Sequence, residues 1–126
     1  MIKIINIDLT KYLVLYIIIM ILIILPNQLF QTKIIKKVIK EHSIKKILLV
    51  EEPRYFTDFK FHKLKLAYHR ATMKKYFSKI KKIKDSLYVD FKNVNSCYEK
   101  NKKNKIIVFN PIDHKLESKL KKIFKK

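Results

Sequence analysis

Apolar and polar positions divide the middle of the chain into a predicted strand and a predicted helix. Residues 47–50 form an apolar run that is too short for a helix, which is typical of a strand buried on both faces of a parallel sheet. Residues 62–83 follow the helical period instead. One face carries Leu66, Met73, Phe77 and Ile80, and the other carries Lys65, Lys75, Lys79 and Lys82. This succession of strand and amphipathic helix is half of a βαβ unit.

Pro53 separates these two elements. It cannot donate a hydrogen bond to a sheet, and it favours an extended backbone at Glu52. Residues 54–61 are therefore predicted to form a loop. Four aromatic side chains make this loop too apolar for a simple linker: Tyr55, Phe56, Phe59 and Phe61.

The same patterns continue on both sides of this unit. We predict further strands at residues 21–25, 86–91 and 105–109, and further helices at residues 33–42 and 115–124. Asp113 is the expected N-cap of the last helix, while the polar residues 92–104 indicate a mobile loop or a damaged helix. The predicted fold is α/β, a Rossmann-like three-layer domain with a mainly parallel sheet and right-handed crossovers.

Residues 12–25 form an unbroken apolar run that permits two interpretations. Its 14 residues would span roughly 21 Å as a helix, less than the ~30 Å of a bilayer core. The interpretation that we favour makes 21–25 the first, fully buried strand of the sheet. Residues 20–126 would then be the Rossmann-like domain and residues 1–19 an apolar N-terminal extension, with Met20 as an alternative start. A membrane segment at 12–25 is the alternative.

Two segments resemble the photolyase-related proteins, the iron-sulfur branch of the cryptochrome and photolyase family. They are residues 49–56 (LVEEPRYF) and residues 61–76 (FHKLKLAYHRATMKKY). The resemblance extends upstream to residues 24–29 (ILPNQL) and downstream to residues 110–113 (NPID). It implies the N-terminal, antenna-type domain of that family, in a truncated or split form. The helical domain that holds flavin, a four-iron cluster and the DNA-lesion pocket in the family lies downstream of the region of resemblance.

Composition restricts the chemistry that is available. The sequence has no glycine, which excludes both a P-loop and a GxGxxG dinucleotide loop. The single cysteine, Cys97, fits a reduced thiol of an intracellular, soluble protein and cannot build a cysteine cage for a cluster. With 30 Lys and Arg against 10 Asp and Glu, the formal net charge is +20, which favours weak, non-specific binding of nucleic acid.

Ligands of an open parallel sheet bind beyond the carboxyl ends of its strands. The residues that follow the first two predicted strands are therefore the candidate site: Asn27, Gln28, Glu51 and Glu52. The resemblance implies that this crevice holds a lumazine-type antenna chromophore. Many relatives have glycine and an acidic residue where this chain has Pro26 and Asn27. The alternative is that the two glutamates simply end a strand in water.

His69 and Arg70 lie at the edge of the apolar face of the long helix. We interpret them as structural, capping backbone carbonyls or pairing with a carboxylate such as Glu51 or Glu52. No arrangement of histidines, carboxylates or a Ser-His-Asp set indicates a metal site or an active site.

The expected function is that of a non-catalytic photolyase-related domain. It would have no DNA-repair activity alone, would bind neither flavin nor an iron-sulfur cluster, and would work with a separately encoded flavin-binding half. Two other classes stay open. One is a small single-pass membrane protein with a basic soluble tail, and the other is a basic nucleic-acid-binding module.

Overall fold

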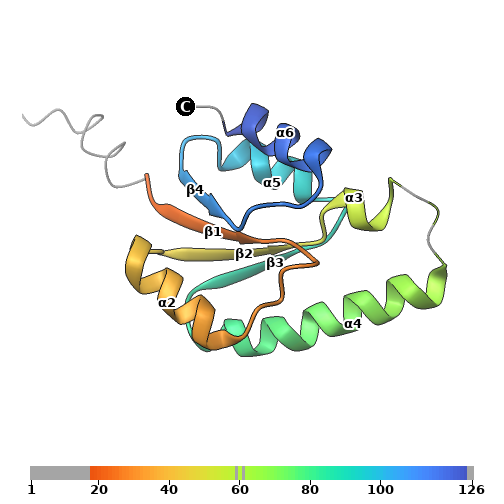
Figure 1. Cartoon of the computed structure of the whole chain (residues 1–126), viewed down its shortest axis with the longest axis horizontal. Coiled ribbons are helices and arrows are strands. Elements are labelled where there is room, and N and C mark those ends of the chain that lie inside the picture. The colour runs from red at the N-terminus through yellow and green to blue at the C-terminus, as the bar shows by residue number, and fades with distance from the viewer. Residues whose placement is uncertain (1–17, 59, 61, 125–126) are drawn as a thin grey trace, which may run out of the picture.

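A computed structural model of the chain describes residues 18–58, 60 and 62–124. Its centre is a sheet of four parallel strands in the order β3-β2-β1-β4 (Figure 1). The strands are β1 (Met20–Ile24), β2 (Lys46–Val50), β3 (Ser86–Val89) and β4 (Lys105–Val108). Each strand pairs with its neighbour without a break, for example Ile23 with Leu48 on one side and with Val108 on the other.

Helices cover both faces of this sheet. They are α2 (Thr32–His42), α3 (Pro53–Phe56), α4 (Lys63–Ile80), α5 (Val94–Lys100) and α6 (His114–Ile123). Figure 1 shows α2 and α4 below the sheet and α5 and α6 above it. The prediction of a three-layer α/β domain with a parallel sheet is confirmed. The strands are connected through helices on both faces, as in a doubly wound sheet.

The central strands explain the long apolar run at the N-terminal end of the sequence. Every residue from Ile21 to Leu25 has an exposed fraction of 0 %. Alternate side chains enter opposite cores, with Ile21 and Ile23 on the α5 and α6 side and Leu22 and Ile24 on the α2 and α4 side. β1 thus requires apolar residues at consecutive positions because both of its faces are covered.

The strand assignment also bears on the membrane alternative for residues 12–25. The second half of that run lies in the centre of the sheet, where it cannot face lipid, and residues 1–17 lie outside the described part. Within residues 18–58, 60 and 62–124, no helix is long and apolar enough to cross a membrane.

Short helices occur in the predicted loop 54–61 and in residues 92–104, which were predicted as a mobile loop or a damaged helix. The residues from 54 to 61 begin with the short helix α3, in which Pro53 occupies the first turn, where a missing N–H costs nothing. The polar stretch from 92 to 104 contains α5, which buries Val94 and Tyr98, one turn apart. Because their neighbours are polar, these two positions gave no recognisable helical pattern in the sequence. The third strand also ends at Val89, two residues earlier than predicted.

α4 packs on the sheet by the apolar stripe that its spacing predicts. Met73 and Ile80 are fully buried, and Leu66 and Phe77 pack against the same core while partly exposed. The first turns of α4 contribute little to the core, since Leu64 is 74 % exposed and Tyr68 is 77 % exposed. Figure 1 shows this end of the helix extending beyond the carboxyl edge of the sheet.

Candidate functional site at the carboxyl edge of the sheet

Glu51 and Glu52 leave β2 at the carboxyl edge of the sheet and are both buried, with exposed fractions of 0 % and 1 %. Consecutive side chains of an extended chain point to opposite faces. Glu51 therefore enters the layer of α4, and Glu52 enters the layer of α5 and α6. Neither carboxylate ends in water, so the alternative that they simply terminate a strand in solvent is wrong.

Glu51 accepts four hydrogen bonds. Arg70 of α4 donates two of them from Nε and Nη2, at 2.6 and 2.8 Å, in a bidentate ion pair. The Tyr88 hydroxyl and the Phe91 backbone N–H donate the others. The carboxylate raises the pKa of the Arg70 guanidinium, while burial and then the hydrogen bond to Glu51 raise the pKa of Tyr88. This cluster ties α4 to the ends of β2 and β3.

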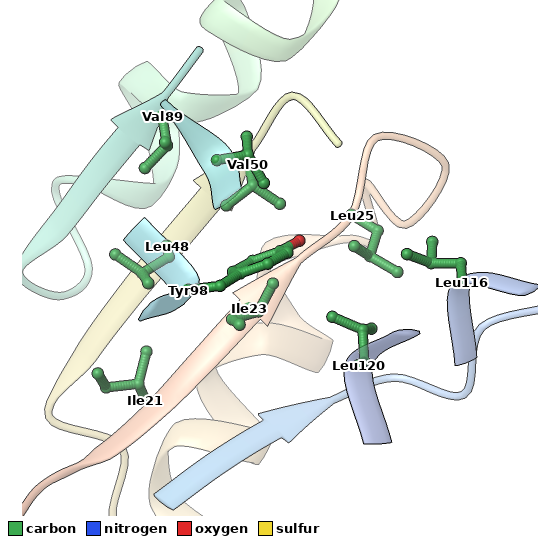
Figure 2. Close-up of a cluster of buried hydrophobic side chains, with 10 residues drawn as sticks. Ile21, Ile23, Leu25, Leu48, Val50, Val89, Tyr98, Leu116 and Leu120 are labelled. Atoms are coloured by element: carbon green, nitrogen blue, oxygen red, sulfur yellow. The ribbon is translucent and has the colours of Figure 1, made fainter. Parts of the chain in front are cut away.

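Glu52 has its partners on the other face. The Tyr98 hydroxyl of α5 donates to Oε2, and the Lys119 ammonium of α6 donates to Oε1 at 2.8 Å. Figure 2 shows the Tyr98 ring among the apolar side chains of this core, beside Leu48 and Ile23. Burial, and then the charge of Glu52, raise the pKa of Tyr98. The hydroxyl therefore remains a donor to the carboxylate at neutral pH.

The turn after β1 holds Asn27 and Gln28, which have different environments. Gln28 is buried: its Oε1 accepts from the backbone N–H of Leu25 at 3.4 Å, and its Nε2 donates to the carbonyl of Phe109 at 2.9 Å. It thereby joins the end of β1 to the segment after β4. Asn27 is exposed and lines a cavity of about 470 Å³.

This cavity, which we call the β1 crevice, lies between the turn after β1 and the first half of α4. Its lining is Pro26, Asn27, Leu29, Lys65, Tyr68, His69 and Thr72. The sequence predicted Asn27 here but missed the contribution of α4. Tyr68 and Leu64 are large apolar side chains on the exposed face of α4, outside its apolar stripe, and this departure from the stripe was the available signal.

His69 and Arg70 have the structural roles that their positions predicted. The His69 Nε2 lies 3.3 Å from the carbonyl oxygen of Pro26, and its ring stacks on Phe56 at 5.3 Å between centroids. Arg70 pairs with Glu51, one of the two carboxylates named as its partner. The two adjacent residues connect α4 to the ends of β1 and β2.

One ion pair at this edge was absent from the sequence prediction. Arg54 Nε lies 2.6 Å from Asp113 Oδ2, while Asp113 also caps α6 by accepting from the N–H groups of Lys115 and Leu116. The Arg54 guanidinium, and then the backbone N–H groups, lower the pKa of Asp113. The predicted N-cap is confirmed, and its second role joins α3 to α6.

We compared the chain with known protein families, curated proteins and solved structures. The model of the deoxyribodipyrimidine photo-lyase-related proteins matches residues 22–126, a range that begins inside β1 and includes β2, β3 and β4. The chain belongs to this family. No curated protein and no solved structure matches it. The resemblance carried by residues 49–56 and 61–76 is therefore confirmed at the level of the family.

The photolyase-related chain offers groups for hydrogen bonds and ion pairs at this edge of the sheet. The four predicted site residues lie at the same edge of the sheet, where Asn27 and Glu51 line two different cavities. Gln28, Glu51 and Glu52 are occupied by partners within the protein. Among the residues that the structure describes, no group of three or more His, Cys, Asp or Glu side chains could hold a metal ion.

Proposed function

We propose that this chain is the antenna-type α/β domain of a photolyase-related protein, with the β1 crevice as the binding place of a lumazine-type chromophore. The observation that supports it is the cavity of about 470 Å³ beyond the carboxyl end of β1, where open α/β sheets bind their ligands. Its size falls within the roughly 300–1,000 Å³ of small-ligand pockets.

The lining of the crevice suits a flat, uncharged ring system that carries a polyhydroxylated side chain. Tyr68 offers an aromatic surface, and the Asn27 amide and the Thr72 hydroxyl offer hydrogen bonds. We assign the direct contact to Asn27. Gln28, Glu51 and Glu52 then act by holding the surrounding turns and α4 in place, since their own polar atoms have partners inside the protein.

The same proposal limits what the domain does alone. We propose that a separate, flavin-binding partner supplies the flavin chemistry and lesion repair that membership of this family suggests. The α/β domain would supply an antenna and a docking scaffold. Its excess of lysine would add weak, salt-sensitive attraction to nucleic acid.

Titration of the purified chain with a ribityl lumazine, followed by fluorescence polarisation, tests the crevice. Asn27→Ala and Tyr68→Ala should each weaken binding by about tenfold, since each removes a hydrogen bond or a stacking surface. Asn95→Ala, which changes an exposed residue of α5, is the matched control. Absence of lumazine binding by the parent chain, or equal losses in all three variants, would exclude the crevice.

A separate experiment tests whether the chain binds flavin by itself. The chain is mixed with flavin and passed through a gel-filtration column, and we expect no visible flavin absorbance in the protein peak. Stoichiometric flavin in that peak would contradict the assignment of flavin chemistry to another polypeptide.

A further inference from the structure

A second cavity lies at the same edge of the sheet and shares no lining residue with the β1 crevice. It has a volume of about 380 Å³ and opens between α4 and the end of β3. α4 contributes Arg70 and Lys74, and the residues after β3 contribute Phe91 and Lys92. We call it the β3 cavity.

Cations dominate the rim of the β3 cavity. The Lys74 ammonium lies 5.6 Å from the centre of the Tyr88 ring, and the Lys92 ammonium lies 6.0 Å from that of Phe91. Neither ammonium has a carboxylate within 4.0 Å among the residues that the structure describes. Both lysines are therefore available to an external anion.

Arg70 is the fixed member of this group. Its Nε and Nη2 are held by Glu51, and its Cζ lies 5.5 Å from the centre of the Phe91 ring. Its side chain nevertheless remains 40 % exposed. A guanidinium positioned by a buried carboxylate loses little freedom when it binds a ligand, which favours recognition of a phosphate.

Two carboxylates also line the cavity, and they set the limit of its positive charge. Glu51 is buried and neutralised by Arg70. Asp90 is exposed, and its Oδ1 accepts hydrogen bonds from the backbone N–H of Lys92 and from the Asn93 amide. Three cations against two carboxylates leave a single net positive charge, and the two unpaired lysines carry it towards solvent.

Half-buried aromatic rings form the floor. Tyr88 and Phe91 present apolar surface between the cations. A cavity near the lower end of the roughly 300–1,000 Å³ range holds a small ligand, and its combination of apolar floor and cationic rim matches a flat ring that carries an anionic group.

We propose that the β3 cavity binds a phosphate monoester carried by a planar ring, with Lys74, Lys92 and Arg70 around the phosphate and the ring against Tyr88 and Phe91. A mononucleotide has this chemistry. The site is separate from the β1 crevice, so its occupancy does not depend on an antenna chromophore.

Calorimetric titration of the full chain with adenosine monophosphate at constant ionic strength tests the site. The double variant Lys74→Gln and Lys92→Gln should bind about tenfold more weakly or worse, since it removes two charge-assisted contacts. Lys115→Gln and Lys122→Gln, exposed positions on α6 across the sheet, form the matched control because they remove the same charge. The control should change affinity by less than about twofold.

Two further measurements test the contributions of the phosphate and of Asp90. Adenosine, which lacks the phosphate, should bind about tenfold more weakly than adenosine monophosphate. Asp90→Asn should tighten binding by about two- to fivefold, because it removes the opposing charge and keeps the oxygen that accepts from the Lys92 N–H.

Several outcomes would overturn the proposal. They are no binding of adenosine monophosphate by the parent chain, equal affinity for adenosine, or equal losses in the two double variants. If both double variants also lose the same affinity for a single-stranded oligonucleotide, the effect comes from diffuse attraction of anions by the basic surface. Asn27→Ala serves as the internal check, and unchanged affinity in this variant separates the β3 cavity from the β1 crevice.

Discussion

The two glutamates at the end of β2 are neighbours in sequence and lie in opposite halves of the molecule. Glu51 is held by a bidentate arginine, a tyrosine and a backbone N–H on the α4 side. Glu52 is held by a tyrosine and a lysine on the α5 and α6 side. One extended backbone thus sends a charge into each helix layer, and each layer meets it with its own donors.

The two clusters differ in how their charge is compensated. The Glu51 cluster satisfies both carboxylate oxygens with a planar guanidinium and adds a backbone N–H donor. The Glu52 cluster depends on one flexible ammonium, whose side chain is 33 % exposed, and on one phenol inside the core. Removing each carboxylate should therefore destabilise the fold to a different degree.

Glu51→Ala should have the largest effect. It leaves the Arg70 charge, the Tyr88 hydroxyl and the Phe91 N–H without their common acceptor, which we expect to cost about 4 kcal/mol of unfolding free energy. That is a large part of the roughly 5–15 kcal/mol of a typical domain. Urea titration followed by circular dichroism measures the change. A loss below about 1 kcal/mol would mean that the buried pair contributes little to stability.

Glu52→Ala should cost less, about 2 kcal/mol, because Lys119 can turn to solvent and only the Tyr98 hydroxyl stays buried without its acceptor. Addition of Tyr98→Phe to Glu52→Ala should recover part of this loss by removing the orphaned donor. The same urea titration measures both variants. Failure of the double variant to recover stability would show that the phenol finds another partner.

Sequence reasoning predicted one side of this comparison much better than the other. α4 on the Glu51 side has an apolar stripe and adjacent His69 and Arg70, so its packing and a pair with Glu51 or Glu52 could be predicted, and the structure shows Glu51 as the partner. On the Glu52 side α6 was predicted, but α5 has seven residues, of which only Val94 and Tyr98 are buried. Two apolar positions among polar neighbours produce no periodic signal, so their burial depends on tertiary packing.

The candidate site was likewise predicted only in part. The edge of the sheet could be predicted, because strand ends are marked by Pro26 and Pro53 and the position rule needs only those ends. Apart from Arg70, the distant partners of the site residues could not be predicted, since Gln28 bonds to Phe109 and Glu52 to Tyr98, which lie 81 and 46 positions away in the chain. Two cavities at one edge, rather than a single crevice, result from how the Arg70 pair positions α4.

Arg70→Lys tests whether geometry or charge stabilises the Glu51 cluster. Lysine keeps the positive charge but cannot make the bidentate pair, and we expect a loss of about 1–2 kcal/mol. Lys75→Ala, on the exposed face of the same helix, should change stability by less than about 0.5 kcal/mol. Thermal and urea unfolding compare the two variants. Equal changes in the two variants would mean that the bidentate geometry of the Arg70 pair contributes no measurable stability.

The smallest effect concerns Asp113, whose ion pair with Arg54 lies nearer to solvent than either buried glutamate. Its pKa in the folded state is lowered, first by Arg54 and then by the N–H groups at the start of α6. Asp113 therefore contributes stability above the unfolded-state pKa of about 3.9, and this contribution is lost as the pH falls through the folded-state value. Asp113→Asn keeps an oxygen for the cap and removes the charge. The urea midpoints of the parent and the variant should differ at neutral pH and converge in acid, whereas parallel curves would show that the charge of Asp113 contributes no stability.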